Sequence, residues 1–369
     1  MKQSLRIIIS GGGTGGHIFP AIAIADAIKN LRPDADILFI GAKNRMEINR
    51  VPAAGYPIKG LWISGFQRSL SFQNLLFPFK VILSYFKARN IVKKFKPDCV
   101  IGVGGYASGP TLRAAISLGC KTLIQEQNSF PGMTNRILAK KVNRICTAYE
   151  KMDKWFPTEK TILTGNPLRK SAVHIEGKRT EAFHFFELSA DKRTLLIVGG
   201  SQGARAINQG VIANLEKYIE SGIQLIWQTG ESFYPEAIAK MNSLSANNVI
   251  KVHPFIQRMD FAFAAADCIV SRAGASSISE MAVIGKPVIF VPLPTAAEDH
   301  QTQNAKRLVN CNAAIMIHNN DTGEVLLNEV ITLINDPVMI KSLSENIVKF
   351  ALPNADQKIA NEILKLIES

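Results

Sequence analysis

The feature that most constrains this chain is a run of glycines between an apolar segment and a helical pattern. Residues 11–17 read Gly-Gly-Gly-Thr-Gly-Gly-His and follow the apolar run 5–9. Apolar side chains then recur at helical spacing over 18–30, which predicts a strand, a tight loop and a helix in that order. Glycine permits positive φ angles and close approach of the backbone to a ligand. The helix N-terminus offers unpaired N–H groups and the positive end of its dipole, so we expect this loop to bind a phosphate.

Strand and helix patterns alternate through the rest of the first half. Short apolar strands are predicted at 37–40, 56–63, 99–103, 121–124, 144–147 and 161–163. A second glycine loop, 102–109, follows one of these strands, and the polar stretch 125–128 follows the next. This alternation predicts a parallel sheet with helices on both faces, where ligands bind at the carboxyl ends of the strands.

The same pattern restarts after a polar stretch, 170–192, which we interpret as a linker. Further strands are predicted at 194–198, 225–228, 249–252, 268–271 and 288–291, with a third glycine loop at 199–204 and a loop that opens a helix at 272–280. The predicted fold class is therefore α/β, with two Rossmann-like domains, 1–169 and 170–369, whose parallel sheets face each other across a cleft. An alternative for the last predicted helix, 359–367, is that it packs back on the first domain.

The charge of the chain is unevenly distributed. Residues 1–169 hold 25 Lys and Arg against 9 Asp and Glu, a net of +16, whereas the remainder holds 18 against 21, a net of −3. We expect the basic half to meet a polyanion or an anionic membrane surface. Nucleic acid is disfavoured because no recognisable module interleaves aromatic with basic residues. The five cysteines form no CxxC pair, which is typical of a cytosolic protein, and no apolar run approaches the roughly 20 residues that span a bilayer.

A basic and apolar stretch, 70–96, carries apolar side chains on two opposite helical faces. A surface helix normally has one apolar face, so the second face indicates contact with something non-aqueous. Lysines and arginines surround it, as in segments that lie on anionic headgroups. We predict membrane contact through Leu75, Phe77, Lys80, Val81 and Tyr85. The alternative is a core helix wrapped by its own domain.

Two sequence patterns resemble known cofactor or metal sites but do not meet their requirements. Gly11-x-Gly13-x-x-Gly16 matches a dinucleotide fingerprint, but the required acidic residue would be Asp36, which begins its strand instead of ending it. Asp34-Ala-Asp36 resembles a metal-binding pair and lies at the same wrong end of the sheet. No His or Cys cluster has metal-ligand spacing, so no obligatory protein-bound metal is predicted. No cofactor is expected to be required, and assistance by a divalent cation without a protein site stays open.

Two side chains remain as candidates for chemistry. His17 lies beside the glycine loop, where a helix N-terminus disfavours the imidazolium and keeps a neutral base. Its alternative is a simple helix N-terminal residue. Glu280 could accept hydrogen bonds from ribose hydroxyls, or could pair with the start of its own helix.

The motifs GGTGGH, GVGGYASGP, QEQNSFPGMTNR, TGNPLR, VGGSQGAR, SRAGASSISE and EDHQTQNA occur in this order along the chain. In order and spacing, the chain resembles the MurG family over essentially its whole length. That family adds N-acetylglucosamine to undecaprenyl-linked lipid I, making lipid II for peptidoglycan. The resemblance implies a GT-B fold, an inverting hexosyl transfer from UDP-N-acetylglucosamine to the 4-hydroxyl of the N-acetylmuramyl unit, and peripheral attachment to the cytoplasmic face of the inner membrane. Cell-wall synthesis proteins are implied as further partners.

The resemblance also implies roles for individual residues. Donor contacts would come from Thr14, Gly15, Gly16, Asn128, Arg169, Ser201, Ile256, Ala275, Ser276, Ser277, Ile278, Ser279, Glu280 and Gln301. Acceptor contacts would come from Gly13, Gly104, Gly105 and Tyr106, with His17 as the catalytic base. Family members vary in length around 295–303, so the choice of Gln301 over His300 and Gln303 stays open.

Other functions stay open as alternatives. A glycolipid synthase or a UDP-N-acetylglucosamine 2-epimerase would share the fold and the donor. A non-catalytic nucleotide-binding membrane scaffold would share only the binding sites.

Overall fold

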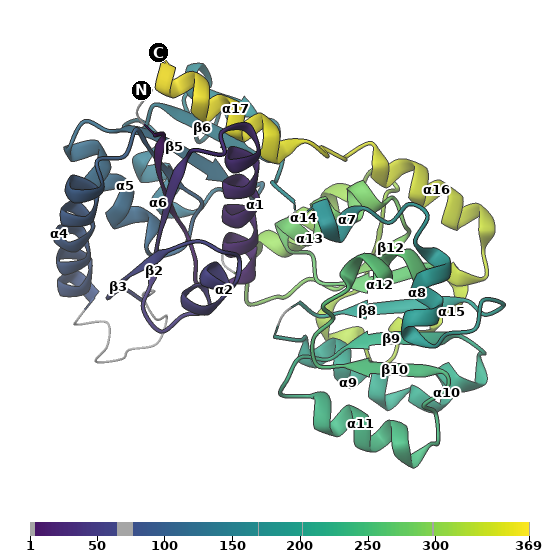
Figure 1. The fold of residues 1–369 in the computed structure, drawn as a ribbon. Coiled ribbons are helices and arrows are strands. Elements are labelled where there is room, and N and C mark those ends of the chain that lie inside the picture. The colour runs from purple at the N-terminus through teal and green to yellow at the C-terminus, as the bar shows by residue number, and fades with distance from the viewer. Residues whose placement is uncertain (1–3, 65–76, 169, 201, 297–298, 369) are drawn as a thin grey trace. The chain divides into compact units, whose positions relative to one another are not determined.

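The computed structural model describes residues 4–64, 77–168, 170–200, 202–296 and 299–368. They divide into two compact units (Figure 1). Unit 1 comprises Met1–Arg169 and Pro353–Ser369, and unit 2 comprises Lys170–Leu352. The predicted membrane contact Leu75 and the predicted donor contacts Arg169 and Ser201 lie outside the described residues.

The described part of unit 1 contains a parallel sheet of seven strands in the order β3-β2-β1-β4-β5-β6-β7. The strands are β1 (Arg6–Ser10), β2 (Asp36–Ala42), β3 (Ile58–Leu61), β4 (Cys99–Gly102), β5 (Lys121–Glu126), β6 (Arg144–Thr147) and β7 (Thr161–Leu163). The order reverses between β1 and β4, which are paired neighbours. Both are buried apolar strands, as expected where helices cover both faces of a parallel sheet.

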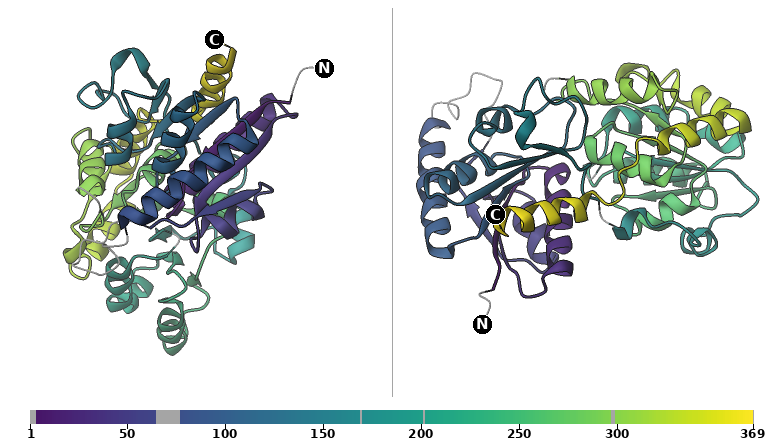
Figure 2. Two further views of the ribbon diagram at one scale, coloured as in Figure 1. Left: turned by 90° about the vertical axis from the view of Figure 1, so that its left-hand side faces the viewer. Right: turned by 90° about the horizontal axis from the view of Figure 1, so that it is seen from above.

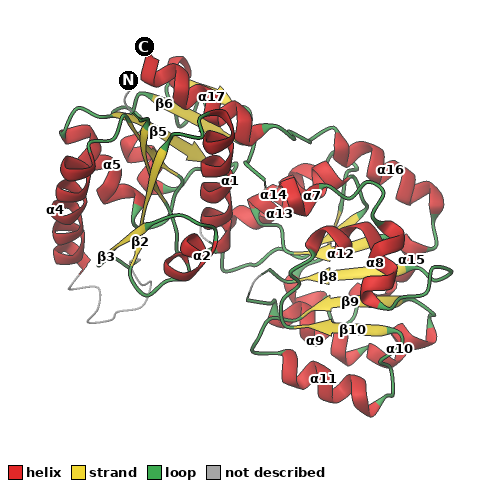
Figure 3. Ribbon diagram, in the orientation of Figure 1, coloured by secondary structure: helices red, strands yellow, loops and turns green. Residues whose placement is uncertain are grey.

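Helices cover each face of this sheet, as Figure 3 shows. They are α1 (Gly15–Leu31), α2 (Glu47–Ala53), α4 (Phe77–Phe95), α5 (Ser108–Ser117), α6 (Met133–Leu138) and α17 (Ala355–Glu368), with a short 3-10 turn at Thr158–Lys160. Because side chains alternate along a strand, Ile7 and Ile9 of β1 pack with α1 and α17, while Ile8 packs with α4 and α5.

The last helix belongs to unit 1, although it is separated in sequence from the rest of that unit. Ile359, Ala360 and Ile363 of α17 are fully buried in the same core as α1. Figures 1 and 2 show the yellow C-terminal helix beside the purple α1. Arg144 of β6 and Glu362 of α17 form an ion pair at 3.6 Å.

The described part of unit 2 repeats the arrangement with six parallel strands in the order β10-β9-β8-β11-β12-β13. The strands are β8 (Thr194–Val198), β9 (Gln224–Gln228), β10 (Ile250–His253), β11 (Cys268–Ser271), β12 (Val288–Phe290) and β13 (Ile315–Met316). The order reverses between β8 and β11. The two-residue strand β13 was missed by the sequence patterns, which are too weak at that length.

The helices of unit 2 are α7 (Lys170–Val173), α8 (Arg179–Phe186), α9 (Arg205–Ala213), α10 (Leu215–Glu220), α11 (Tyr234–Ser243), α12 (Met259–Ala265), α13 (Ala275–Ile284), α14 (His300–Val309), α15 (Leu326–Ile334) and α16 (Pro337–Val348), with a 3-10 turn at Asn319–Asp321. Leu195 and Ile197 of β8 pack with α9, α11 and α15. Leu196 packs with α8, α12, α13 and α14 on the other face.

The prediction of a linker at 170–192 is wrong. This stretch forms α7 and α8 of unit 2, and Ala182, Phe183 and Phe186 are buried in the same core as Leu196 of β8. Only three apolar positions of α8 face the core, which is why its pattern resembled a polar linker.

The α/β fold class with two parallel, Rossmann-like sheets is confirmed. None of the helices in the described ranges is long and apolar enough to span a membrane.

Candidate functional site

Two glycine loops of unit 1 meet where its strand order reverses. One loop follows β1 and the other follows β4. Gly105 has a φ of 82°, and a Cβ built on it would lie 2.1 Å from the carbonyl oxygen of Gly12. At Gly104, with a φ of 93°, a Cβ would lie 2.8 Å from the ring of His17. Glycine at both positions therefore lets the loops close on each other, at the switch point where parallel sheets bind ligands.

His17 lies in the first turn of α1, beside the ends of three strands. Its helix follows β1, its ring packs on Gly104 after β4, and its Nδ1 is 2.7 Å from Oε1 of Gln127, just after β5. The ring is half-buried. An imidazole placed at this edge can exchange a proton with a ligand bound at the loops.

A buried carboxylate that the sequence patterns did not reveal supports the first glycine loop. Glu47 begins α2 and is 1% exposed. Its Oε2 accepts a hydrogen bond from the N–H of Gly13 (3.0 Å), and its Oε1 accepts one from the N–H of Ala42 (2.9 Å). A Cβ at Gly12 or Gly41 would collide with this side chain. The available signal was an acidic residue at a helix start just after the strand that neighbours β1.

A second buried carboxylate orders the segment after β5. Glu126 is 3% exposed, and its Oε1 accepts a hydrogen bond from the N–H of Asn128 (3.0 Å). Its Oε2 accepts from the N–H of Gly132 (3.1 Å) and from Nδ2 of Asn135 (2.8 Å). Asn128 is thereby held at the same edge of the sheet as the two glycine loops.

Unit 2 has a matching site at its own switch point. The loop 199–204 follows β8, and Gly203 has a φ of 78°, where a Cβ would lie 1.9 Å from the carbonyl oxygen of Thr229. The buried Gln228 connects this loop to the next segment. Its Nε2 donates to the carbonyl of Gly200 (2.9 Å), and its Oε1 accepts from the N–H of Ile256 (2.8 Å). The N–H of Ile256 is thus already engaged within the protein.

The N-terminus of α13 follows β11, the neighbour of β8 in the sheet. Ser276 lies in its first turn, and among the described residues its buried Oγ has no hydrogen-bond partner. The Oγ of Ser279 instead donates to the carbonyl of Ala275 (3.0 Å). A buried hydroxyl beside helix N–H groups is suited to an anionic ligand, because both can donate hydrogen bonds to it.

The loop before α13 is anchored by Arg272. Its guanidinium donates to the carbonyls of Val291 (3.0 Å) and Pro292 (3.1 Å) and to Oδ1 of Asn319 (2.8 Å). Burial lowers the pKa of Arg272 to about 10, so the side chain stays charged at neutral pH. Its positive charge therefore remains close to the start of α13.

Gln301 lies in the first turn of α14, after the loop that follows β12. Its Oε1 accepts a hydrogen bond from the N–H of Leu293 at 2.9 Å. This contact orients the amide, so that Nε2 is the group that Gln301 could offer to a ligand. The side chain is half-buried, whereas Gln303 is exposed.

Two of the α4 side chains predicted to contact a membrane lie on the inner face of the helix. Val81 and Tyr85 pack against the core of unit 1, and the Tyr85 hydroxyl lies 3.1 Å from Oγ of Ser117. Phe77 and Lys80 are half-buried. The exposed apolar side chains are those of the opposite face, Phe79 (63%), Ile82 (53%), Leu83 (54%) and Phe86 (60%). Helical periodicity showed two apolar faces but could not tell which one faces the core.

The structure brings the remaining predicted residues together within each unit. Unit 1 gathers Gly13, Thr14, Gly15, Gly16, His17, Gly104, Gly105, Tyr106 and Asn128 at the carboxyl ends of its central strands. Unit 2 places Ile256, Ala275, Ser276, Ser277, Ile278, Ser279, Glu280 and Gln301 in segments that follow β10, β11 and β12. These placements fit the predicted roles without testing them.

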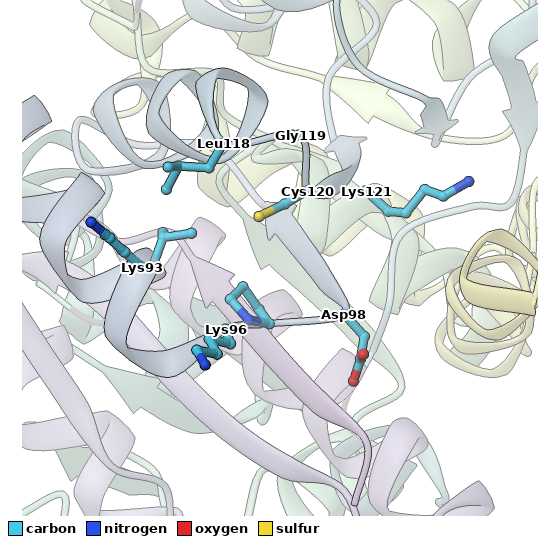
Figure 4. Close-up of a pocket in the computed structure, with 9 residues that line it drawn as sticks. Lys93, Lys96, Asp98, Leu118, Gly119, Cys120 and Lys121 are labelled. Carbon is cyan, nitrogen blue, oxygen red and sulfur yellow. The ribbon is translucent and has the colours of Figure 1, made fainter. Parts of the chain in front are cut away.

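A cavity of about 400 Å³ lies at the other edge of the unit 1 sheet, where β4 and β5 begin (Figure 4). Lys93 and Lys121 at its rim point in opposite directions, so its cations do not converge on one ligand (Figure 4). We therefore place the candidate site at the glycine loops. In the described ranges, no three His, Cys, Asp or Glu side chains gather as a metal site requires.

Comparison with known proteins identifies a family. The profile of the glycosyltransferase family 28 N-terminal domain matches residues 7–147, and that of the C-terminal domain matches 194–359. A protein of Christiangramia forsetii, named UDP-N-acetylglucosamine–N-acetylmuramyl-(pentapeptide) pyrophosphoryl-undecaprenol N-acetylglucosamine transferase, is 52% identical over 369 residues and covers 100% of both chains.

Solved structures are also similar. The crystal structure of Acinetobacter baumannii MurG matches with a TM-score of 0.76 and 30% identity, over 98% of this chain and 99% of that one. The UDP-GlcNAc 2-epimerase of Neisseria meningitidis, bound to UDP-GlcNAc, matches with a TM-score of 0.67 over 98% of this chain and 100% of that one. Its identity is only 14%, so this likeness shows the fold alone.

Proposed function

Because this chain belongs to glycosyltransferase family 28, we propose that it transfers N-acetylglucosamine from UDP-N-acetylglucosamine to lipid I, giving lipid II, the reaction implied by its resemblance to the MurG family. The observation that carries the proposal is the 52% identity, over the full length of both chains, to a transferase named for that reaction. The glycine loops and the hydroxyl of Ser276, which has no partner within the described part of the chain, supply local support, since the donor and the acceptor each carry a diphosphate.

Unit 2 would bind the donor. The first turn of α13 with Ser276 would hold the diphosphate, and Glu280 would accept hydrogen bonds from the ribose hydroxyls. Since the N–H of Ile256 is bonded to Gln228, its carbonyl is the backbone group we assign to the uracil. The Nε2 of Gln301 would donate to a sugar hydroxyl, because its Oε1 is already bonded to Leu293.

Unit 1 would bind the acceptor. The loops that carry Gly13 and Gly104 would meet its pyrophosphate, with Tyr106 at their rim. Thr14 to Gly16 and Asn128 would contact the transferred sugar. His17 would act as the general base at this edge of the sheet.

The chemistry follows from these roles. The acceptor 4-hydroxyl gives its proton to His17 as its oxygen attacks the anomeric carbon, with inversion to a β-(1→4) bond. The bond from that carbon to the diphosphate breaks, and UDP leaves with the electron pair. Preorganised N–H groups at α13 stabilise the charge that develops on the leaving diphosphate. A general base typically contributes 10²–10⁴ in rate.

The exposed apolar face of α4 supports attachment to a membrane surface. Phe79, Ile82, Leu83 and Phe86 could enter the boundary between headgroups and acyl chains, while neighbouring cations contact anionic lipids. We propose that the protein binds the cytoplasmic face of the inner membrane peripherally, where a lipid-linked acceptor would be presented.

A transfer assay tests this function. Purified protein receives radiolabelled UDP-N-acetylglucosamine with a short-chain lipid I analogue, with diacylglycerol, or with no acceptor. We expect transfer to the lipid I analogue only, and a loss of about 10²-fold or more in turnover in His17→Ala. Transfer only to diacylglycerol would indicate a glycolipid synthase. An epimerised sugar nucleotide without acceptor would indicate an epimerase, and UDP binding without turnover a scaffold.

A further inference from the structure

A chain of three buried side-chain amides ends at His17. Oε1 of Gln127 lies 2.7 Å from Nδ1 of His17. Nε2 of Gln127 donates to the backbone carbonyl of Val103 (2.8 Å) and to Oε1 of Gln125 (2.9 Å). Gln125 in turn donates from Nε2 to Oδ1 of Asn166 (3.1 Å), whose Nδ2 donates to the backbone carbonyl of Gln127 (3.1 Å). The three amides are each at most 3% exposed.

The orientation of these amides follows from the backbone carbonyls, which can only accept hydrogen bonds. Since the Asn166 NH₂ group faces the carbonyl of Gln127, its Oδ1 must face Gln125 and accept a proton from it. The Gln125 oxygen therefore faces Gln127. The NH₂ group of Gln127 then has two acceptors, this oxygen and the carbonyl of Val103, which together use both of its protons. Its Oε1 is left facing His17.

An amide oxygen can only accept, so Nδ1 of His17 must carry the proton that joins the two groups. We propose that Gln127 is a positioning residue that holds the neutral imidazole of His17 as the Nδ1–H tautomer, with the lone pair on Nε2. The inference rests on the proposed function, in which His17 takes the proton of the acceptor hydroxyl. Gly104 packs against the same ring and restricts its position further.

The tautomer matters because a base needs an unprotonated nitrogen. If the neutral ring carried its proton on Nε2, that nitrogen could not receive the proton of a hydroxyl. An amide orients the ring without a negative charge, so it stabilises the imidazolium less than a carboxylate would. In catalytic triads, loss of the correct tautomer costs about 10⁴ in turnover when the orienting group is a carboxylate. For an uncharged amide we expect a smaller loss, about 10- to 100-fold.

The test is a histidine ¹⁵N NMR spectrum of the full-length protein. The chain has six histidines, so the His17 signals are assigned by their loss in His17→Gln. At a pH where the ring is neutral, we expect a pyrrole-type signal for Nδ1 and a pyridine-type signal for Nε2. The opposite pattern in the wild-type protein would overturn the proposal, and this measurement needs no folded variant at Gln127.

Gln127→Leu provides the second measurement. We expect its His17 to shift toward the Nε2–H tautomer and kcat to fall about 10- to 100-fold, with KM for UDP-N-acetylglucosamine within about threefold. Gln224→Leu is the matched control, because Gln224 is an equally buried glutamine in β9, away from both sites. It should leave the His17 spectrum unchanged.

The outcomes distinguish a wrong role for Gln127 from a wrong role for His17. A wild-type tautomer that persists in Gln127→Leu would overturn the role of Gln127. A changed tautomer with unchanged kcat would support that role and overturn His17 as the base, while lipid II formation itself would stand.

Discussion

Single residues decide how closely the loops of unit 1 approach each other. Gly55 and Gly105 have nearly the same positive φ, 85° and 82°. Only Gly105 has another backbone in the space that a Cβ would fill, since nothing lies within 4 Å of the equivalent point at Gly55. Comparing substitutions at the two glycines therefore separates the free-energy cost of the backbone conformation from that of the close approach.

Replacement of these glycines by alanine should give unequal effects. Gly55→Ala should lower the free energy of unfolding by about 1–2 kcal/mol, the cost of a left-handed conformation for an L-residue. Gly105→Ala should cost more, because its Cβ would meet the Gly12 carbonyl at 2.1 Å, and should reduce transfer about tenfold or more. Urea unfolding and the transfer assay measure both quantities. If the two variants lost equal amounts of stability and of transfer activity, the close approach of Gly105 to Gly12 would add no cost of its own.

Helix α4 has two apolar faces in different environments. Its inner face holds the core of unit 1 through Ala88 and Val92, while Phe79 and Phe86 on its outer face are more than half exposed. Large apolar side chains grouped on one exposed helix face usually mark an interaction surface. The two faces should therefore respond differently to substitution.

The double variant Phe79→Ser/Phe86→Ser should weaken binding to anionic vesicles about tenfold or more, since each buried phenyl ring contributes about 1.5–3 kcal/mol. Its free energy of unfolding should stay within about 0.5 kcal/mol of the wild type. Val81→Ser, on the inner face, should lower stability by about 1–3 kcal/mol and leave vesicle affinity nearly unchanged. Vesicle co-sedimentation and chemical denaturation would check this, and unchanged sedimentation of the double variant would contradict the membrane role of this face.

At the scale of the whole molecule, the chain returns to unit 1 after completing unit 2. The core of unit 1 includes Ile359, Ile363 and Leu366, which lie more than 300 residues after β1. Unit 1 is therefore not complete until the C-terminal helix has been made, and its stability depends on that helix.

Ile359→Ala/Ile363→Ala should selectively destabilise unit 1, because each buried Ile to Ala change costs about 2–5 kcal/mol. Hydrogen exchange should speed up in β1 and β4 and stay unchanged in β8 and β11. Gln357→Ala, on the exposed side of the same helix, serves as the control. Equal acceleration in the two sheets would contradict the assignment of α17 to unit 1.

Much of the fold and site was predictable because it depends on neighbours in the chain. An apolar run, a glycine loop and a helical pattern are local, so the strands beside Gly11–Gly16 and Gly199–Gly203 and the N-terminus of α13 could be located in advance. The motifs that identify the family are local for the same reason. The short strand β13 and helix α8 escaped because few of their residues carry a pattern.

Contacts between distant segments required the folded chain. His17 and Gln127 are 110 residues apart, and Gly13 and Glu47 are 34 apart, so no spacing rule connects them. The outward face of α4 was likewise decided by what packs beneath it, since its periodicity suits either orientation. Local patterns thus determined which elements form and where the glycine loops lie. Tertiary packing determined which carboxylates and amides orient the site and which apolar face meets solvent, because those energies arise only when the strands assemble.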